Sequence, residues 1–149
     1  MSTYTAGYDT DFYTWTQAQA ALLREGAFNE LDLVNLAEEI ESLGKSDRRA
    51  LGSHLEGLVM HLLKWQYQPR RRQTGHSWYS TIVEHRSQIR AIVEDSPSLQ
   101  RAVSVLLERR YPSARQRASG DTHLSLVTFP EACPWSAEQV LDAAFFPEV

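Results

Sequence analysis

The chain has 149 residues, of which 42% are hydrophobic and 23% are charged. This length and balance are typical of a globular protein that buries a core without metals or disulfides, and they exclude the disordered and fibrous classes. No apolar run approaches the roughly 18 to 20 residues that a membrane-spanning helix needs, and the N-terminus lacks a secretory signal pattern. The lone Cys133 cannot form an internal disulfide, as expected in a reducing compartment. We therefore predict a single cytoplasmic helical domain over residues 1–149 that does not contact a membrane.

Charge is distributed unevenly along the chain, whose formal net charge is −4. Residues 1–56 carry ten acidic and four basic side chains, residues 57–117 carry four acidic and eleven basic ones, and the remainder carries five acidic and no basic ones. Two explanations fit this pattern: the segments neutralise one another in the fold, or the basic middle contacts an anionic partner. Nucleic-acid-binding domains usually have a basic net charge, so the pattern favours internal neutralisation.

Apolar side chains recur every three or four residues in several stretches, which predicts amphipathic helices. No stretch shows the alternation of a half-buried strand. Helices joined by short turns favour antiparallel packing. We therefore predict an all-α fold, an antiparallel bundle of four to five helices with a C-terminal tail that contains a short helix. The expected helices run from about Asp9 to Gly26, from about Asn29 to Leu43, from about Ser46 to Tyr67, from near Ser77, and from near Pro97.

Glycine, proline and serine predict where these helices begin and end. A turn around GKSD, residues 44–47, should separate the second helix from the third. Pro69 disfavours helical geometry at Gln68 and should end the third helix. Pro112 should kink or interrupt the fifth, because proline removes a helical hydrogen bond and crowds the preceding turn. Ser136 should begin the short helix in the tail.

Histidines on the third and fourth predicted helices are candidates for chemistry. At about 100° per residue, His54 and His61 lie within about 20° of each other at the edge of the apolar stripe. His85 lies inside the stripe of its helix and should be buried. If the second, third and fourth helices are neighbours, Glu39 or Glu41 can approach His61 and His85.

Two histidines and a carboxylate suit zinc, iron or nickel, so the metal candidates are Glu41, His61 and His85. However, the sequence has neither the Glu-x-x-His spacing of di-iron bundles nor a His-Glu-x-x-His motif. The alternative is structural: the carboxylate accepts a hydrogen bond from a histidine, since buried polar groups need partners. The sequence favours this structural interpretation, and we expect no cofactor.

The stretch HLLKWQYQPRRR, residues 61–72, is a candidate binding segment. It joins the end of an apolar helix to three arginines, and aromatic side chains beside phosphate-binding cations are typical of nucleic-acid sites. The same arginines also suit the negative end of a helix dipole, or can pair with the acidic N-terminal helices. The predicted binding residues are Trp65, Gln68, Arg70, Arg71, Arg72 and Trp78.

Six motifs follow one another along nearly the whole chain: YDTDFYTW at 8–15, LAEEIESLGKSDRRAL at 36–51, HLLKWQYQP at 61–69, SWYSTIVEHR at 77–86, DSPSL at 95–99 and FPEACPWSAEQVLDAAFFPE at 129–148. Together they resemble domain of unknown function family 29, a family of small bacterial proteins. The resemblance implies a single all-helical domain and leaves the activity open. The positions that match the family pattern are Asp11, Trp15, Glu38, Glu39, Glu41, His61, Leu62, Lys64, Gln68, Pro69, Trp78, Ile82 and Arg86.

The resemblance also bears on the candidate sites. His54 is not part of the family pattern, and a glutamine is common where this chain has His85. The matching positions leave a polar cluster as the candidate catalytic site, and its members are Glu41, His61, Lys64 and Arg86.

From these observations we predict a non-enzymatic binding or interaction protein that presents residues 61–72 to an acidic protein or a nucleic acid. A homo-oligomer subunit is a further hypothesis. The alternative is an enzyme, metal-dependent or a metal-free phosphodiesterase, in which His61 works with Glu41 while Arg86 or Lys64 holds an anion. Geometry discriminates between them. Convergence of His61, Glu41 and Arg86 in one accessible cleft would support an enzyme, whereas separate pairing and burial would indicate structural roles.

Overall fold

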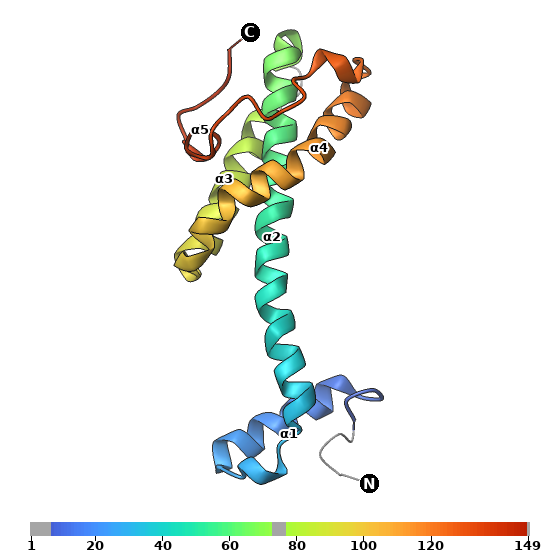
Figure 1. The fold of residues 1–149 in the computed structure, drawn as a ribbon, viewed down its shortest axis with the longest axis vertical. Coiled ribbons are helices and arrows are strands. Elements are labelled where there is room, and N and C mark those ends of the chain that lie inside the picture. Colours follow the sequence, from blue (N-terminus) through green and yellow to red (C-terminus); the bar gives the residue numbers. More distant parts are fainter. Residues whose placement is uncertain (1–6, 73–76, 149) are drawn as a thin grey trace. The chain divides into compact units, whose positions relative to one another are not determined.

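The computed structural model describes residues 7–72 and 77–148, and in those ranges the secondary structure is helical, with no strand (Figure 1). The α-helices are α1 (Phe12–Glu25), α2 (Leu33–Tyr67), α3 (Ser77–Asp95), α4 (Val103–Thr122) and α5 (Ala137–Leu141). Short 3₁₀ helices lie between them at Phe28–Glu30, Pro69–Arg71, Pro97–Ala102 and Leu126–Thr128. The predicted all-α fold, with a short helix in the C-terminal tail, is confirmed.

The chain forms two compact units, residues 1–46 and 47–149. The first unit contains α1 and the beginning of α2, and the second contains the rest of α2 with α3, α4 and α5. Within the second unit, α3 turns back along the end of α2, and α4 crosses them (Figure 1). That the whole chain is one domain stays a prediction.

The core of the second unit is built on one face of α2. Leu51, Leu55, Leu58 and Leu62 recur at the three- and four-residue steps seen in the sequence, and each is fully buried. Burial of one such leucine stabilises the fold by about 2 kcal/mol. The side chains that pack on this face come from α3, α4 and the C-terminal segment, and include Ile82, Ile89, Val103, Leu106, Ala114, Phe129 and Val140.

The predicted turn at residues 44–47 is wrong, because α2 continues through Gly44 without a break. A single glycine in a helix interior lowers stability by only about 1 kcal/mol relative to alanine, and no proline follows Gly44. The helical turns on either side are therefore sufficient to keep the helix continuous. Gly26 behaves as predicted. It ends α1 with a φ of 74°, in the left-handed region that suits glycine.

Pro112 does not interrupt the helix that contains it, because α4 runs from Val103 to Thr122. An interior proline costs about 3 kcal/mol, but the residues around it bury well: Tyr111, Ala114 and Ala118 are at most 2% exposed. This packing offsets the cost of the proline, so α4 continues through it. The short helix in the tail begins as predicted at Ser136, which forms a capping box with Gln139. Pro97 opens a 3₁₀ helix instead of an α-helix.

The glycines of α2 differ in what surrounds them. A Cβ at Gly57 would lie 2.6 Å from Nε2 of His85, whereas a Cβ at Gly44 would meet nothing within 4 Å. We expect Gly44→Ala to raise the free energy of unfolding by about 0.5–1 kcal/mol, because alanine favours helix. Gly57→Ala should lower it, because the His85 ring must move. Denaturant unfolding followed by circular dichroism measures both changes, and stabilisation by Gly57→Ala would contradict this packing.

Candidate functional site

Arg72, one of the predicted binding residues, holds the C-terminal tail against the end of α2. Its Nε donates to the Trp65 carbonyl at 2.6 Å, and its Nη2 donates to the Pro147 carbonyl at 3.4 Å. Its guanidinium carbon lies 4.9 Å from the centroid of the Trp65 ring, a cation–π contact. Its Nη1 lies 4.0 Å from Oε2 of Glu148. Arg72 and Trp65 are therefore occupied within the fold.

The other predicted binding residues do not form one accessible surface. Arg70 and Arg71 are exposed on the 3₁₀ helix Pro69–Arg71, and Gln68 is half-buried just before it. Trp78 is buried in α3, with Nζ of Lys64 5.1 Å from the centroid of its ring. The indole of Trp78 is thus covered and cannot serve as a stacking platform.

Arg86, a candidate catalytic residue, is a buried clamp between α3 and the tail. It is 4% exposed, and its Nε and Nη2 donate to the carbonyls of Val140 at 2.9 Å and Phe145 at 2.7 Å. Its guanidinium carbon lies 5.2 Å from the centroid of the Phe146 ring. Burial lowers the pKa of Arg86, and the carbonyl oxygens and the aromatic face replace part of the lost hydration. Sequence reasoning found this residue but not its role, because its partners lie more than 50 positions further along the chain.

We expect Arg86→Lys to lower the free energy of unfolding by about 2–4 kcal/mol, because an ammonium group cannot reproduce the forked donation to two carbonyls. Arg90 lies one turn further along the same helix and is exposed, so Arg90→Lys should change the free energy by less than about 0.5 kcal/mol. Urea unfolding of both variants measures the difference. Equal small effects would show that Arg86 does not act as a clamp.

Three histidines lie together between α2 and α3. Nδ1 of His54 and Nδ1 of His85 are 3.0 Å apart, so that one donates and the other accepts. Nδ1 of His61 donates to the carbonyl of Gly57 at 2.8 Å, and the rings of His61 and His85 are 6.0 Å apart between centroids. The hypothesis of a metal site required His61 and His85 to be neighbours, which they are, but the predicted burial of His85 is only partial.

The environment of these rings favours their neutral forms. Burial lowers the pKa of His85 to about 4, and the charges of His54, His61 and Arg117 contribute in the same direction. Burial also lowers the pKa of His61, and the charge of Lys64 adds to this effect. Both histidines are therefore neutral at neutral pH.

This environment predicts a pH dependence of stability. A histidine ordinarily titrates near pH 6.5, so below that pH the unfolded chain binds protons that His85 in the folded chain does not. Stability should fall as the pH drops from 6.5 towards 4. In His85→Gln the amide can still bond to His54 but cannot titrate, so the variant should lose less stability over this window. Urea midpoints at both ends of the window test this, and identical pH dependence in the two proteins would contradict it.

The predicted catalytic cluster is divided among separate contacts. Lys64 pairs with Asp121 at 3.2 Å, His61 bonds to its own helix and Arg86 holds the tail. Glu41 is exposed and belongs to the first unit. By the criterion stated above, these contacts indicate structural roles for the basic members of the cluster.

The predicted metal ligands are Glu41, His61 and His85. Two of them, His61 and His85, are neighbours. Within the described part of the chain, however, no group of three or more His, Cys, Asp or Glu side chains has an arrangement that could hold a metal ion. The geometry therefore gives this predicted site no support.

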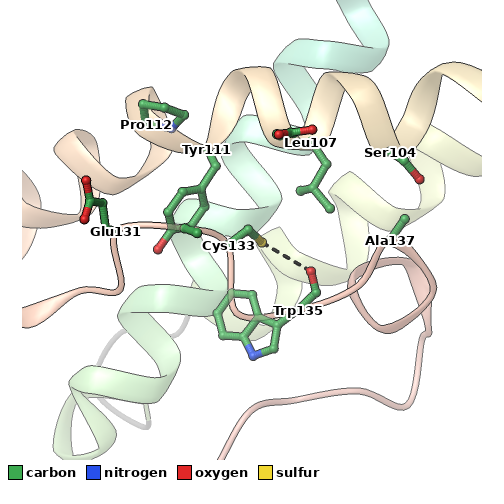
Figure 2. A pocket seen from close by; sticks show the side chains of 10 residues that line it. Ser104, Leu107, Tyr111, Pro112, Glu131, Cys133, Trp135 and Ala137 are labelled. Carbon is green, nitrogen blue, oxygen red and sulfur yellow. Dashed lines mark hydrogen bonds between the residues drawn. The ribbon is translucent and has the colours of Figure 1, made fainter.

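A cavity of about 460 Å³ lies between α4 and the segment that precedes α5, with Tyr111 and Trp135 among its lining side chains (Figure 2). The Tyr111 hydroxyl donates to the Pro130 carbonyl at 2.6 Å, and Sγ of Cys133 donates to the Trp135 carbonyl at 3.4 Å. Burial raises the pKa of Tyr111 to about 12 and also raises the pKa of Cys133. The thiol is therefore protonated at neutral pH, and a protonated thiol is a weak nucleophile.

The first unit is organised around one buried indole. Trp15 is 2% exposed, and its Nε1 donates to the carboxylate of Asp32 at 3.0 Å. Asp32 is itself 4% exposed, and its backbone N–H donates to the side-chain oxygen of Gln19 at 2.9 Å. Asn35 adds a second side-chain donor to the Asp32 carboxylate at 2.8 Å. This buried polar network fixes the beginning of α2 against α1.

Beside this network lies an apolar groove of about 370 Å³ between α1 and α2. Phe12 and Leu23 on α1 are each 48% exposed, and Ile40 and Leu43 on α2 are 65% and 68% exposed. The groove is lined by Phe12, Trp15, Thr16, Gln19, Ala20 and Leu23 of α1 and by Leu36, Glu39, Ile40 and Leu43 of α2. We refer to this set as the N-terminal groove.

Exposed apolar side chains are concentrated in this part of the molecule. Among the described residues, eight of the thirteen exposed large hydrophobic side chains belong to the first unit, although it is much the shorter of the two. Among residues 7–46, the buried hydrophobic side chains are Trp15 and Leu31. Sequence reasoning predicted the amphipathic helices but missed the groove. The sequence did contain a signal for the groove, because α1 and the beginning of α2 each have an apolar stripe and this unit has few other residues that could cover them.

These observations define a small all-α protein with an exposed apolar groove in its first unit. The family model for the domain of unknown function DUF29 matches residues 7–146, and the chain belongs to this family. Comparison with curated proteins and with solved structures gives no significant match. Among the described helices, none is long and apolar enough to cross a membrane.

Proposed function

We propose that this protein is a non-enzymatic interaction protein that binds a helical segment of another protein in its N-terminal groove. The observation that carries the proposal is the concentration of exposed apolar side chains around this groove, described above. Contiguous exposed apolar surface is unfavourable in water unless it serves a contact, and it is typical of protein-binding sites. A groove between two helices is also the usual receptor for a third helix.

The charge of the first unit supports a protein as the partner rather than a nucleic acid. Residues 7–46 carry eight acidic and two basic side chains. A nucleic-acid site needs cations to neutralise phosphates, and an acidic surface repels them. Binding of a nucleic acid at this unit would therefore be opposed by charge.

Contact between residues 61–72 and an acidic protein or a nucleic acid stays a prediction of the sequence. Fewer side chains of this segment are available for such a contact than the sequence suggests, because Arg72, Trp65 and Trp78 make contacts within the fold. Arg70 and Arg71 are the exposed arginines of the segment. A cytoplasmic location and a homo-oligomeric state also stay predictions.

The proposal is tested by removing apolar surface from the groove without removing core. The double variant Ile40→Ser/Leu43→Ser replaces two side chains that are exposed in the structure. The free energy of unfolding should therefore change little. A partner protein is first isolated from an extract of the source cells and purified. It should bind this variant at least about tenfold more weakly than it binds the unchanged protein, because anchor side chains contribute more than about 1 kcal/mol each. Titration calorimetry measures the dissociation constants.

Two matched variants complete the test. Val105→Ser/Val127→Ser removes exposed apolar side chains from the second unit and should leave the affinity unchanged. Arg70→Ser/Arg71→Ser removes the exposed arginines of the basic segment. If the partner is lost only with the arginine variant, the contact belongs to the basic segment and the groove proposal fails. It also fails if the partner binds all three variants equally.

A further inference from the structure

We infer that the helix bound in the N-terminal groove is amphipathic and basic, with Lys or Arg beside its apolar face. This inference rests on the proposed function and adds the chemistry of the partner to it. The length of the groove, the spacing of its walls and the charge around it all bear on which partner it can bind.

The walls of the groove have helical spacing. On α2 the apolar lining residues are Leu36, Ile40 and Leu43, at steps of four and three residues. On α1 the lining extends from Phe12 to Leu23, which corresponds to about 16 Å along a helix axis, or three turns. A partner helix of about three turns, with apolar side chains at the same steps, can place its ridge between these rows.

A helix suits this receptor better than an extended strand does. An added strand gains affinity from main-chain hydrogen bonds to a free sheet edge, and the described part of the chain contains no strand. The groove is flanked by two helices, whose backbone groups bond within each helix. The partner must therefore bind through side chains, and a helix presents a continuous apolar stripe for that purpose.

The surroundings of the groove are acidic. Glu39 lines the groove itself, and no basic residue is among the lining residues. Glu38 and Glu41 are exposed on the same stretch of α2, and Asp11 and Glu25 flank α1. By helix geometry Glu38 and Glu41 point to the side of α2 opposite the groove, so Glu39, which also accepts a hydrogen bond from the Tyr8 hydroxyl, is the carboxylate that a basic side chain of the partner would meet. The remaining carboxylates attract a basic helix at longer range, which steers association and favours this partner over neutral or acidic ones.

The same charge argues against pairing of two copies through this surface. A symmetric dimer would bring two grooves together, and each belongs to a unit with six more acidic than basic side chains among residues 7–46. Like charges brought together at an interface cost free energy. The structure thus favours a different protein as the source of the helix.

The experiment compares synthetic peptides of one length, each designed as a helix with the same leucine stripe. The flanking positions carry Lys in one peptide, Gln in a second and Glu in a third, and a scrambled Lys peptide has no apolar face. Fluorescence anisotropy of labelled peptides gives dissociation constants at low and high salt. We expect the Lys peptide to bind at least about tenfold more tightly than the Gln peptide at low salt, and the difference to shrink at high salt.

Protein variants locate the binding. Ile40→Ser/Leu43→Ser should weaken both the Lys and the Gln peptide, because both place leucines in the groove. Glu39→Gln, whose amide oxygen can still accept the hydrogen bond from Tyr8, removes the carboxylate that lines the groove and should weaken the Lys peptide alone, towards the affinity of the Gln peptide. The control Glu94→Gln removes an exposed carboxylate from α3 and should leave every affinity unchanged.

The outcomes separate this inference from the proposed function. If the Gln or Glu peptide binds as tightly as the Lys peptide and depends on Ile40 and Leu43, a basic partner is ruled out while the groove remains a binding site. If the Lys peptide binds equally to the groove variant, or no better than its scrambled form, the attraction is nonspecific and the inference is overturned. If none of the peptides shows groove-dependent binding, a basic amphipathic helix is overturned as the occupant, and titration of the purified native partner decides the proposed function independently.

Discussion

The burial of one apolar face of α2 is the constraint on which the second unit depends. Leu51, Leu55, Leu58 and Leu62 occupy that face, and α3, α4 and the C-terminal segment all pack on it. The same helix begins in the first unit, where Ile40 and Leu43 are largely exposed. One continuous helix thus supplies a closed core to one unit and one wall of an open groove to the other.

Each unit uses a buried charged side chain to fasten a segment that apolar packing alone would leave loosely defined. In the first unit the Asp32 carboxylate accepts from Trp15 and Asn35, and in the second Arg86 donates to two carbonyls of the tail. Burying a charge is unfavourable unless hydrogen bonds replace its hydration, so these groups fix one geometry more sharply than apolar contacts do. For Arg86 the replacement is partial, because its Nη1 is buried without a hydrogen-bond partner. Arg86, a candidate catalytic residue in the sequence, therefore has a structural explanation, because it holds the tail against α3.

Local patterns predicted most of the helical structure, and long-range contacts account for what they missed. The stop at Gly26 and the start at Ser136 depend on neighbouring residues, and both were predicted. The break at Gly44 was wrong because a glycine only weakens a helix that its neighbours can sustain. The clamp formed by Arg86 could not be predicted, because nothing near position 86 indicates that the tail returns to cover α3.

The uneven distribution of charge gains a physical interpretation from the ion pairs. The described ion pairs lie within residues 56–148: Lys64 with Asp121, Arg72 with Glu148, and both Arg110 and Arg117 with Glu56. Part of the basic middle of the chain is therefore neutralised inside the second unit, as the sequence favoured. In the first unit, acidic side chains outnumber basic ones by six over residues 7–46, and the apolar groove is exposed. The excess negative charge and the exposed apolar surface are both unfavourable in the unbound protein. A basic, apolar helix would relieve both at once, and this shared benefit is the strongest physical reason to look for such a partner.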